Sequence, residues 1–211
     1  MLTRLAAVAA TLVLAAAGIV LGVPQAFAGG PAGVVCDGET SVGVGGLYVA
    51  LNGTYENSAY IGADVAVGYD SLNPGQGLAN LGYTVDMLRA ECPADHLKLV
   101  GHSEGAALVH AWVSAHPFAE NVSAVLISDP KRVAGPGWAG LADVPGAWLV
   151  GYPLAGVDAN FGAVPVLNVC RHDDMVCNTQ AGWFGYFTGA HTSYNYSPDA
   201  YPDYASGIWF Y

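Results

Sequence analysis

The segment 97–107, with the sequence Leu-Lys-Leu-Val-Gly-His-Ser-Glu-Gly-Ala-Ala, constrains the fold more than any other part of this chain. It predicts a short apolar strand, a Gly-x-Ser-x-Gly turn and then a helix. A sharp turn of this kind pushes the side chain of Ser103 out of the packed layers. Gly101 and Gly105 are required because a Cβ at either position would collide with the turn. The backbone N–H of Glu104 then lies at a helix start, where it can face an oxyanion.

Apolar segments of strand length recur along the chain, and each is followed by a turn or a helix. Strands are predicted over residues 64–69, 96–100, 122–128 and 164–169, and helices over 78–89 and 106–115. This alternation indicates an α/β fold in which a mostly parallel sheet carries helices on both faces. Right-handed crossovers place the carboxyl ends of the strands at one edge, so functional groups should gather there.

Two longer segments have an irregular composition. Residues 131–161 are rich in Gly, Pro and Trp. We interpret them as a loop with one short helical piece, which either walls a site at the strand ends or is an ordinary crossover. The tail 194–211 carries five tyrosines and a tryptophan. It is predicted to pack on the body, because a disordered tail would be poorer in aromatic residues.

Residues 1–28 are predicted to be a signal peptide rather than part of the fold. Arg4 precedes a charge-free apolar run over residues 5–27, and Ala-Phe-Ala at 26–28 fits a cleavage site. The run is also long enough to span a bilayer, so an uncleaved anchor is the alternative. Removal leaves residues 29–211, a length that suits a single domain of an exported protein.

The net charge of the chain limits the kinds of molecule that it is expected to bind. The chain has 17 acidic and 6 basic residues, for a formal net charge of −11. A nucleic-acid backbone or an anionic membrane surface would be repelled, so neither is expected to bind. No obligate protein partner is evident, and we expect a monomer.

The four cysteines predict two disulfides. Cys36, Cys92, Cys170 and Cys177 give an even count in a chain expected to reach an oxidising compartment. Three pairings are possible, and free buried thiols are the alternative. The Cys-x6-Cys spacing is poor for zinc, so no metal site is predicted.

A serine hydroxyl is a weak nucleophile that needs a base within hydrogen-bond reach, and an acid must orient that base. In this architecture the chain order is serine, acid, histidine. Asp173 and Asp174 lie just after the last of these strands, within the segment 170–177, and His191 lies in a loop of small residues. The pattern therefore predicts nucleophilic catalysis at Ser103.

Several of these motifs occur together in one known family. They are the turn Gly-x-Ser-x-Gly-Ala-Ala preceded by Cys92-Pro93, then Asp129-Pro130, then Cys-x3-Asp-x2-Cys over 170–177, and a late His-x2-Tyr at 191–194. This set resembles the cutinase family of secreted serine esterases. The resemblance runs from about Cys92 to Tyr194, and more loosely from Cys36. There is a fainter resemblance to the hydrolase domain attached to mycobacterial PE and PPE proteins.

The cutinase resemblance assigns roles to individual residues. It implies that Ser103 is the nucleophile, His191 the base and Asp174 the orienting acid. Asp173 replaces a glycine that is usual in the family, so it is a competing acid. The family's disulfide pattern implies pairing of Cys36 with Cys92 and of Cys170 with Cys177.

The resemblance also implies a fold and an activity. The expected fold is a small three-layer α/β/α hydrolase with about five strands and no large lid. The expected reaction is hydrolysis of carboxylic esters of the lipid or polyester type, without a cofactor. One alternative is acyl transfer to a sugar or lipid alcohol. Another is a secreted domain that binds lipid or protein and has lost turnover.

The residues around the serine depart from the family pattern. His102 and Glu104 stand where Tyr and Gln are usual. We expect the Glu104 side chain to bond away from the pocket, because a carboxylate there opposes a developing oxyanion. Its N–H is one predicted oxyanion donor. The second comes from Gly45-Gly46-Leu47 or from the segment 52–56, where Thr54 is the candidate. The aromatic residues Trp183, Phe184, Tyr186 and Phe187 form either an acyl-chain wall or core.

Overall fold

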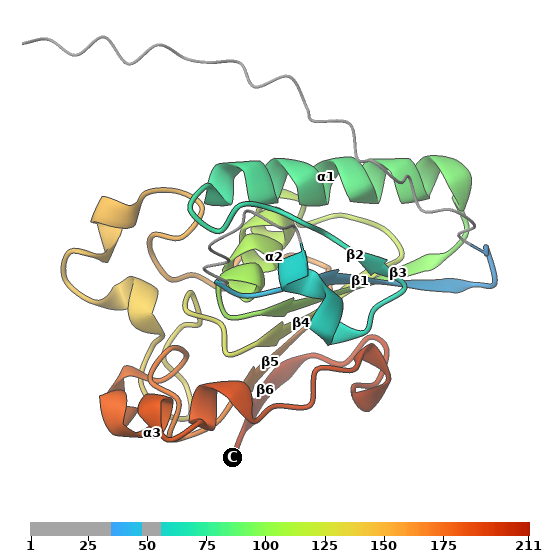
Figure 1. The fold of residues 1–211 in the computed structure, drawn as a ribbon. Helices are drawn as coiled ribbons and strands as arrows, with labels where there is room; N and C mark the ends of the chain where they lie inside the picture. Colours follow the sequence, from blue (N-terminus) through green and yellow to red (C-terminus); the bar gives the residue numbers. More distant parts are fainter. Residues whose placement is uncertain (1–34, 48–55) are drawn as a thin grey trace, which may run out of the picture. The chain divides into compact units, whose positions relative to one another are not determined.

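The computed structural model describes residues 35–47 and 56–211, which build a six-stranded sheet (Figure 1). The strands are β1 (Glu39–Val44), β2 (Val65–Ala66), β3 (His96–His102), β4 (Val122–Ile127), β5 (Val166–Cys170) and β6 (Gly207–Phe210). Their order is β2-β1-β3-β4-β5-β6, and every neighbouring pair is parallel. The predicted α/β class is confirmed, with one strand more than expected.

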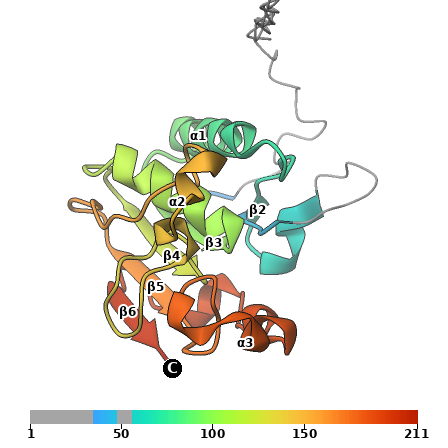
Figure 2. The same cartoon turned by 90° about the vertical axis from the view of Figure 1, so that its left-hand side faces the viewer.

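The longer helices share one face of the sheet. They are α1 (Pro74–Glu91) and α2 (Glu104–Ala115), whose apolar sides pack together on β1, β3 and β4 (Figure 2). The opposite face is covered by the 3₁₀ helix η1 (Glu56–Ile61) and by the tyrosines Tyr194 and Tyr201 of the C-terminal segment. The remaining elements are α3 (Trp183–Phe187), η2 (Leu141–Asp143), η3 (Ala147–Val150), η4 (Thr179–Ala181), η5 (Ala190–Thr192) and η6 (Pro198–Ala200).

The observed bounds differ from the predicted ones most in two elements. Helix α1 begins at Pro74 instead of residue 78, because the Asn73 side chain accepts the Gln76 N–H (3.2 Å) and proline fits the first helical position. Strand β2 ends at Ala66, although a strand was predicted as far as residue 69. Tyr69 instead enters the core and donates its O–H to the Gly45 carbonyl (2.7 Å).

Buried basic side chains hold the segment 131–161 against the body. The Arg132 Nε donates to the Cys177 carbonyl (2.8 Å), and the Lys131 Nζ donates to the Ala155 carbonyl (2.6 Å). These bonds fix an otherwise irregular stretch in which η2 and η3 are the short helical pieces. The loop interpretation is confirmed, with two short helical pieces where one was predicted, and the loop lies at the carboxyl edge of the sheet (Figure 1).

The C-terminal segment packs on the body, as predicted, and ends in a strand. Strand β6 pairs with β5, and the carbonyl of Tyr211 accepts the His172 N–H (2.7 Å). The Arg171 guanidinium lies over the Tyr211 ring, 5.7 Å from its centroid. The end of the chain therefore supports the turn that follows β5.

Both disulfides have the pairing implied by the family resemblance. Cys36 bonds Cys92, which joins the segment before β1 to the end of α1, and Cys170 bonds Cys177 across the turn after β5. In residues 35–47 and 56–211, no helix has the length and apolar character needed to cross a membrane. The signal peptide predicted over 1–28 lies outside the described residues.

The disulfides are expected to contribute unequally to stability. The Cys36–Cys92 bond spans a separation of 56 residues and the Cys170–Cys177 bond one of 7. Loop-closure entropy gives about 4 kcal/mol for the first and about 2.5 kcal/mol for the second. We predict that replacing the first pair by serine lowers the free energy of unfolding in urea more than replacing the second pair. The reverse order would contradict this account.

Candidate active site

The turn between β3 and α2 has the strained geometry that the sequence predicts. Ser103 has a φ of 55°, in the left-handed region. A Cβ on Gly101 would lie 2.5 Å from the Gly105 carbonyl oxygen, and a Cβ on Gly105 would lie 2.0 Å from that of Val44. Neither backbone oxygen can yield, so both positions require glycine.

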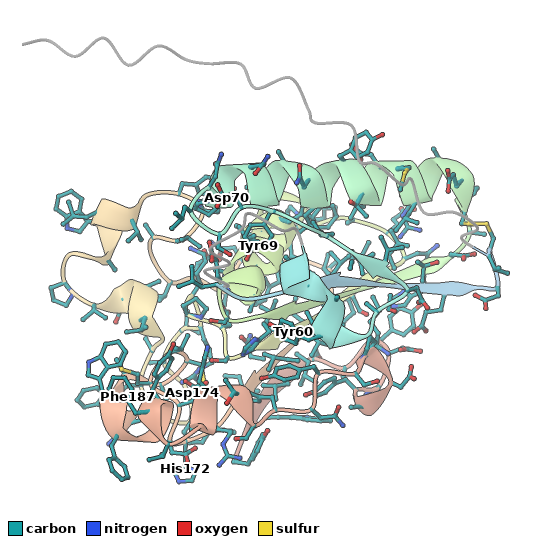
Figure 3. All side chains as sticks on the ribbon, in the orientation of Figure 1. Tyr60, Tyr69, Asp70, His172, Asp174 and Phe187 are labelled. Carbon is teal, nitrogen blue, oxygen red and sulfur yellow. A yellow bond between two sulfur atoms is a disulfide. The ribbon has the colours of Figure 1, made fainter. Side chains whose placement is uncertain are left out.

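Sheet order brings four strand ends together. Strands β1, β3, β4 and β5 are consecutive neighbours in a parallel sheet, so their carboxyl ends lie at the same edge. The residues that follow them are the loop 45–47, Ser103, Ser128 and the turn 171–177, respectively. The predicted meeting of polar residues at one edge is therefore observed, and Figure 3 labels Asp174 and His172 at the end of β5.

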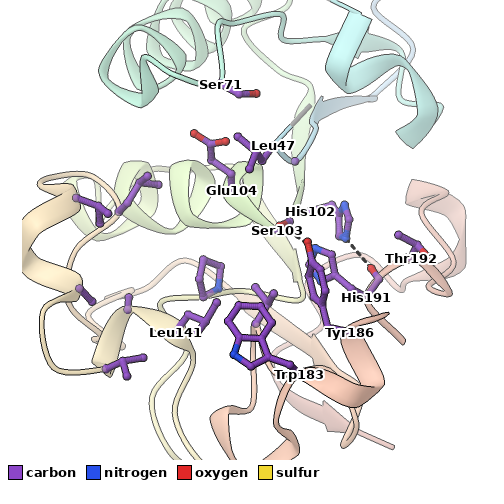
Figure 4. Close-up of a pocket in the computed structure, with 18 of the residues that line it drawn as sticks. Leu47, Ser71, His102, Ser103, Glu104, Leu141, Trp183, Tyr186, His191 and Thr192 are labelled. Carbon is purple, nitrogen blue, oxygen red and sulfur yellow. Dashed lines mark hydrogen bonds between the residues drawn. The ribbon is translucent and has the colours of Figure 1, made fainter. Parts of the chain in front are cut away.

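The three side chains proposed for catalysis are in hydrogen-bond contact. The Nε2 of His191 lies 2.9 Å from the Ser103 Oγ, and its Nδ1 lies 3.0 Å from the Asp174 Oδ2. His191 belongs to η5, which places it beside the turn at Ser103 (Figure 4). Because Nδ1–H donates to the carboxylate, the lone pair of Nε2 faces the serine hydroxyl.

Asp174 is fully buried, and three further donors surround it. Ser128 Oγ and Tyr194 Oη (2.8 Å) donate to Oδ2, and the Val176 N–H donates to Oδ1 (3.0 Å). Burial alone would raise the pKa of Asp174, but the bonds from His191, Ser128 and Tyr194 outweigh it and lower that pKa. The carboxylate therefore stays ionised beside the imidazole.

Ser128 also approaches the imidazole directly. Its Oγ lies 3.0 Å from the His191 Nδ1, so Ser128 bridges Asp174 and His191. Ser128 was not identified from the sequence, although it lies immediately before the Asp129-Pro130 motif. Its φ of 52° marks a sharp turn at the end of β4, and this turn is a signal only the structure reveals.

The competing acid does not contact the imidazole. The Asp173 carboxylate pairs with the Arg171 guanidinium (3.1 Å), and its side chain is 37% exposed. The bond from Arg171 lowers the pKa of Asp173. Of the two candidates, Asp174 is the one that the fold brings to His191.

His102 links three segments of the site. Its Nε2 lies 3.1 Å from the carbonyl of His191, which can only accept, so Nε2 carries the proton. Its Nδ1 therefore accepts the Tyr60 O–H (2.6 Å), and the Tyr60 oxygen accepts the Gly46 N–H (2.9 Å). Burial and the neighbouring His191 ring lower the pKa of His102 to about 3, so the ring is neutral.

The loop after β1 borders the serine. A Cβ on Gly46 would lie 2.9 Å from the Ser103 Cβ, so the backbone of this loop packs directly against the serine. Of the two predicted sources of the second oxyanion donor, 45–47 is the one that the described structure brings to Ser103. The other candidate, Thr54, lies outside the described residues.

The expectation that the Glu104 side chain bonds away from the pocket is wrong. Glu104 lines the pocket and is 8% exposed, and neither carboxyl oxygen has a hydrogen-bond partner within 35–47 and 56–211 (Figure 4). Because Glu104 is the first residue of α2, there is no preceding helical turn against which its side chain could pack. Burial, helped by the charge of Asp70, raises the pKa of Glu104 to about 7.

The site opens into a cavity of about 870 Å³. Its wall is mostly apolar, and the segment 131–161 supplies Leu141, Ala142, Val144, Ala147, Val150 and Leu154. Trp183 and Tyr186 of α3 line it as well, which favours the acyl-chain wall over core for these two. Phe184 and Phe187 are instead 80% and 78% exposed.

The raised pKa of Glu104 predicts how the stability of the fold depends on pH. A carboxyl whose folded pKa, about 7, exceeds its ordinary 4.5 destabilises the fold once the pH is high enough to ionise it. We therefore predict that the wild type loses up to about 3 kcal/mol of unfolding free energy between pH 4.5 and 7, relative to Glu104→Gln. Urea unfolding at several pH values measures this. Glu120→Gln, at an exposed position, is the control, and parallel curves for wild type and Glu104→Gln would contradict the prediction.

Solved structures that align with the chain include several hydrolases. A cutinase-like protein from Cryptococcus sp. is 20% identical, with 68% of this chain and 79% of that chain covered and a TM-score of 0.47. An acetylxylan esterase is 16% identical, with 74% and 96% covered and a TM-score of 0.44. A putative YdeN-like hydrolase from Pectobacterium atrosepticum is 13% identical, with 82% and 77% covered and a TM-score of 0.44. No curated protein matches the chain.

A family model identifies the family of this chain. A family model described as Cutinase matches residues 37–201, which is well over half of the chain. The matched range contains β1 to β5, the turn at Ser103, and both Asp174 and His191. The chain therefore belongs to the cutinase family and is a carboxylic ester hydrolase.

Proposed function

We propose that this protein is a secreted serine esterase with Ser103 as nucleophile, His191 as general base and Asp174 as orienting acid. The observation that carries the proposal is the 2.9 Å contact from Ser103 Oγ to an imidazole whose other nitrogen bonds a buried carboxylate. A hydroxyl in this contact can lose its proton as it attacks a carbonyl.

In acylation, the Ser103 Oγ attacks the ester carbonyl carbon while its proton moves to the His191 Nε2. The resulting oxyanion accepts hydrogen bonds from backbone N–H groups, one of them that of Glu104. Gly45 and Gly46 already donate their N–H groups to Ser58 and Tyr60, so we assign the second oxyanion donor to Leu47. The His191 proton then passes to the leaving alcohol, and an acyl-serine remains.

In deacylation, His191 takes a proton from water, and the hydroxide attacks the acyl carbonyl. Collapse of the second oxyanion returns the proton to Ser103 and releases the carboxylic acid. The mostly apolar wall of the cavity suits an acyl chain of the lipid or polyester type. The two disulfides support export, and residues 1–28 are the proposed signal, which the N-terminal sequence of exported protein would test.

Acyl transfer is a second candidate because it uses the same acyl-serine. An alcohol in place of water at the second step gives a new ester instead of an acid. Analysis of the products formed with a sugar or lipid alcohol present separates the two reactions. The reading in which the domain has lost turnover is disfavoured by the contacts that join Ser103, His191 and Asp174.

A matched pair of variants tests the assignment of the acid. We predict that Asp174→Asn lowers kcat for p-nitrophenyl butyrate about a thousandfold, because the amide favours the wrong imidazole tautomer. Asp173→Asn changes only a half-exposed pair with Arg171, so its kcat should stay within about twofold of wild type. A serine-directed phosphonate should label Ser103 in the wild type. Equal losses in the two variants, or labelling of another residue, would refute the assignment.

A second pair of variants tests whether Tyr60 holds the loop 45–47, which carries the proposed second oxyanion donor. Tyr60→Phe removes the hydroxyl that joins Gly46 to His102, so we predict a fall in kcat of about tenfold with little change in KM. Tyr204→Phe is the control, since its ring packs on His96, near the amino end of β3. If both variants keep wild-type kcat, the loop does not depend on Tyr60.

A further inference from the structure

Glu104 stands out among the residues that line the pocket. It is the one carboxyl among the described lining residues, which include no lysine or arginine. At 8% exposure, with both oxygens unpartnered within 35–47 and 56–211, it lacks the bonds that a buried carboxyl normally has. A polar group left unpaired in a pocket is a candidate for contact with a ligand.

The direction of the Glu104 side chain indicates which part of an ester it meets. Figure 4 shows it on the side of Ser103 away from His191, toward Leu47 and Ser71. The leaving alcohol must lie next to the His191 Nε2, which gives it a proton. The acyl part of the ester therefore extends away from His191, into the part of the pocket that Glu104 borders.

We infer that the Glu104 carboxyl is a specificity-determining group that binds a hydrogen-bond donor carried by the acyl part of the substrate. The inference rests on the proposed function. Two kinds of donor share this chemistry, a hydroxyl and an ammonium group. An ionised carboxylate accepts from either of them and also attracts the charge of an ammonium, whereas a protonated carboxyl keeps an acceptor oxygen but lacks that attraction.

The groups around Glu104 are compatible with such a ligand. Tyr69 directs its hydroxyl to the Gly45 carbonyl, and Asp70 adds negative charge nearby (Figure 3). Because the pKa of Glu104 is raised to about 7, both of its protonation states occur near neutral pH. A hydroxyl suits both states, and an ammonium would lower that pKa on binding.

The test compares methyl esters that differ only in the donor. The substrates are methyl hexanoate, its derivatives with a hydroxyl at carbon 3, 5 or 6, and methyl 6-aminohexanoate, each followed by alkaline titration at pH 8. The readout is kcat/KM for a donor-bearing ester divided by kcat/KM for methyl hexanoate, so that general changes in rate cancel. We expect at least one donor to be preferred about tenfold by the wild type.

Variants then assign the preference to the carboxyl. Glu104→Met, which has a similar unbranched shape, should bring the ratio close to one. Glu104→Gln retains an acceptor without the charge, so it should keep a preference for a hydroxyl but lose one for ammonium. Leu141→Ala alters the apolar wall, and it should change the rates of all the esters without changing the ratio.

The outcomes separate the inference from the proposed function. Preference for a hydroxyl or for ammonium identifies the donor and supports the inference. A wild-type ratio near one for every donor, or an unchanged ratio in Glu104→Met, overturns it while ester hydrolysis itself stands. If the wild type hydrolyses none of the esters, including p-nitrophenyl butyrate, the proposed function fails first.

Discussion

The backbone at Ser103 adopts its positive φ only because three neighbouring positions lack side chains. Gly101 and Gly105 leave space for the turn itself, and Gly46 leaves space beside the serine. These glycines belong to β3, to α2 and to the loop after β1, so the turn depends on correct pairing between strands as well as on local sequence. Parallel packing of β1 against β3 is therefore a condition for the serine to be presented at all.

The second condition for this site is that the buried carboxylate of Asp174 has its hydrogen-bond donors in place. Asp174 has no exposed surface, so its position is fixed by the groups that donate hydrogen bonds to it. Ser128 comes from the end of β4, Tyr194 from the segment after η5, and Asp174 from the turn closed by the Cys170–Cys177 bond. These three parts of the chain must be in place before the His191 imidazole has Asp174 as its partner. The site therefore depends on the whole carboxyl edge of the sheet.

The sequence predicted what depends on local pattern and missed what depends on tertiary contact. The turn at Ser103 and the acid turn before Cys177 have short motifs, so their residues were identified from sequence. Tyr60 and Ser128 have no such motif, because each matters only through a hydroxyl that the fold carries to a distant ring. Glu104 was assigned the wrong direction, since the rotamer at a helix start is set by its surroundings and not by its neighbours in sequence. Strand β6 was anticipated only as a packed tail, because four residues are too few to show a period.

The contact between Tyr211 and His172 gives strand β6 an unexpected importance. The Tyr211 carbonyl accepts the N–H of His172, which lies two residues before Asp174. Strand β6 therefore stabilises the turn that carries Asp174. A change that weakens the pairing of β6 with β5, or a deletion of β6, would act on the carboxylate from outside the pocket. In a recombinant version of this enzyme, the way in which the chain is handled around β6 therefore bears on the proposed active site as well as on the stability of the sheet edge.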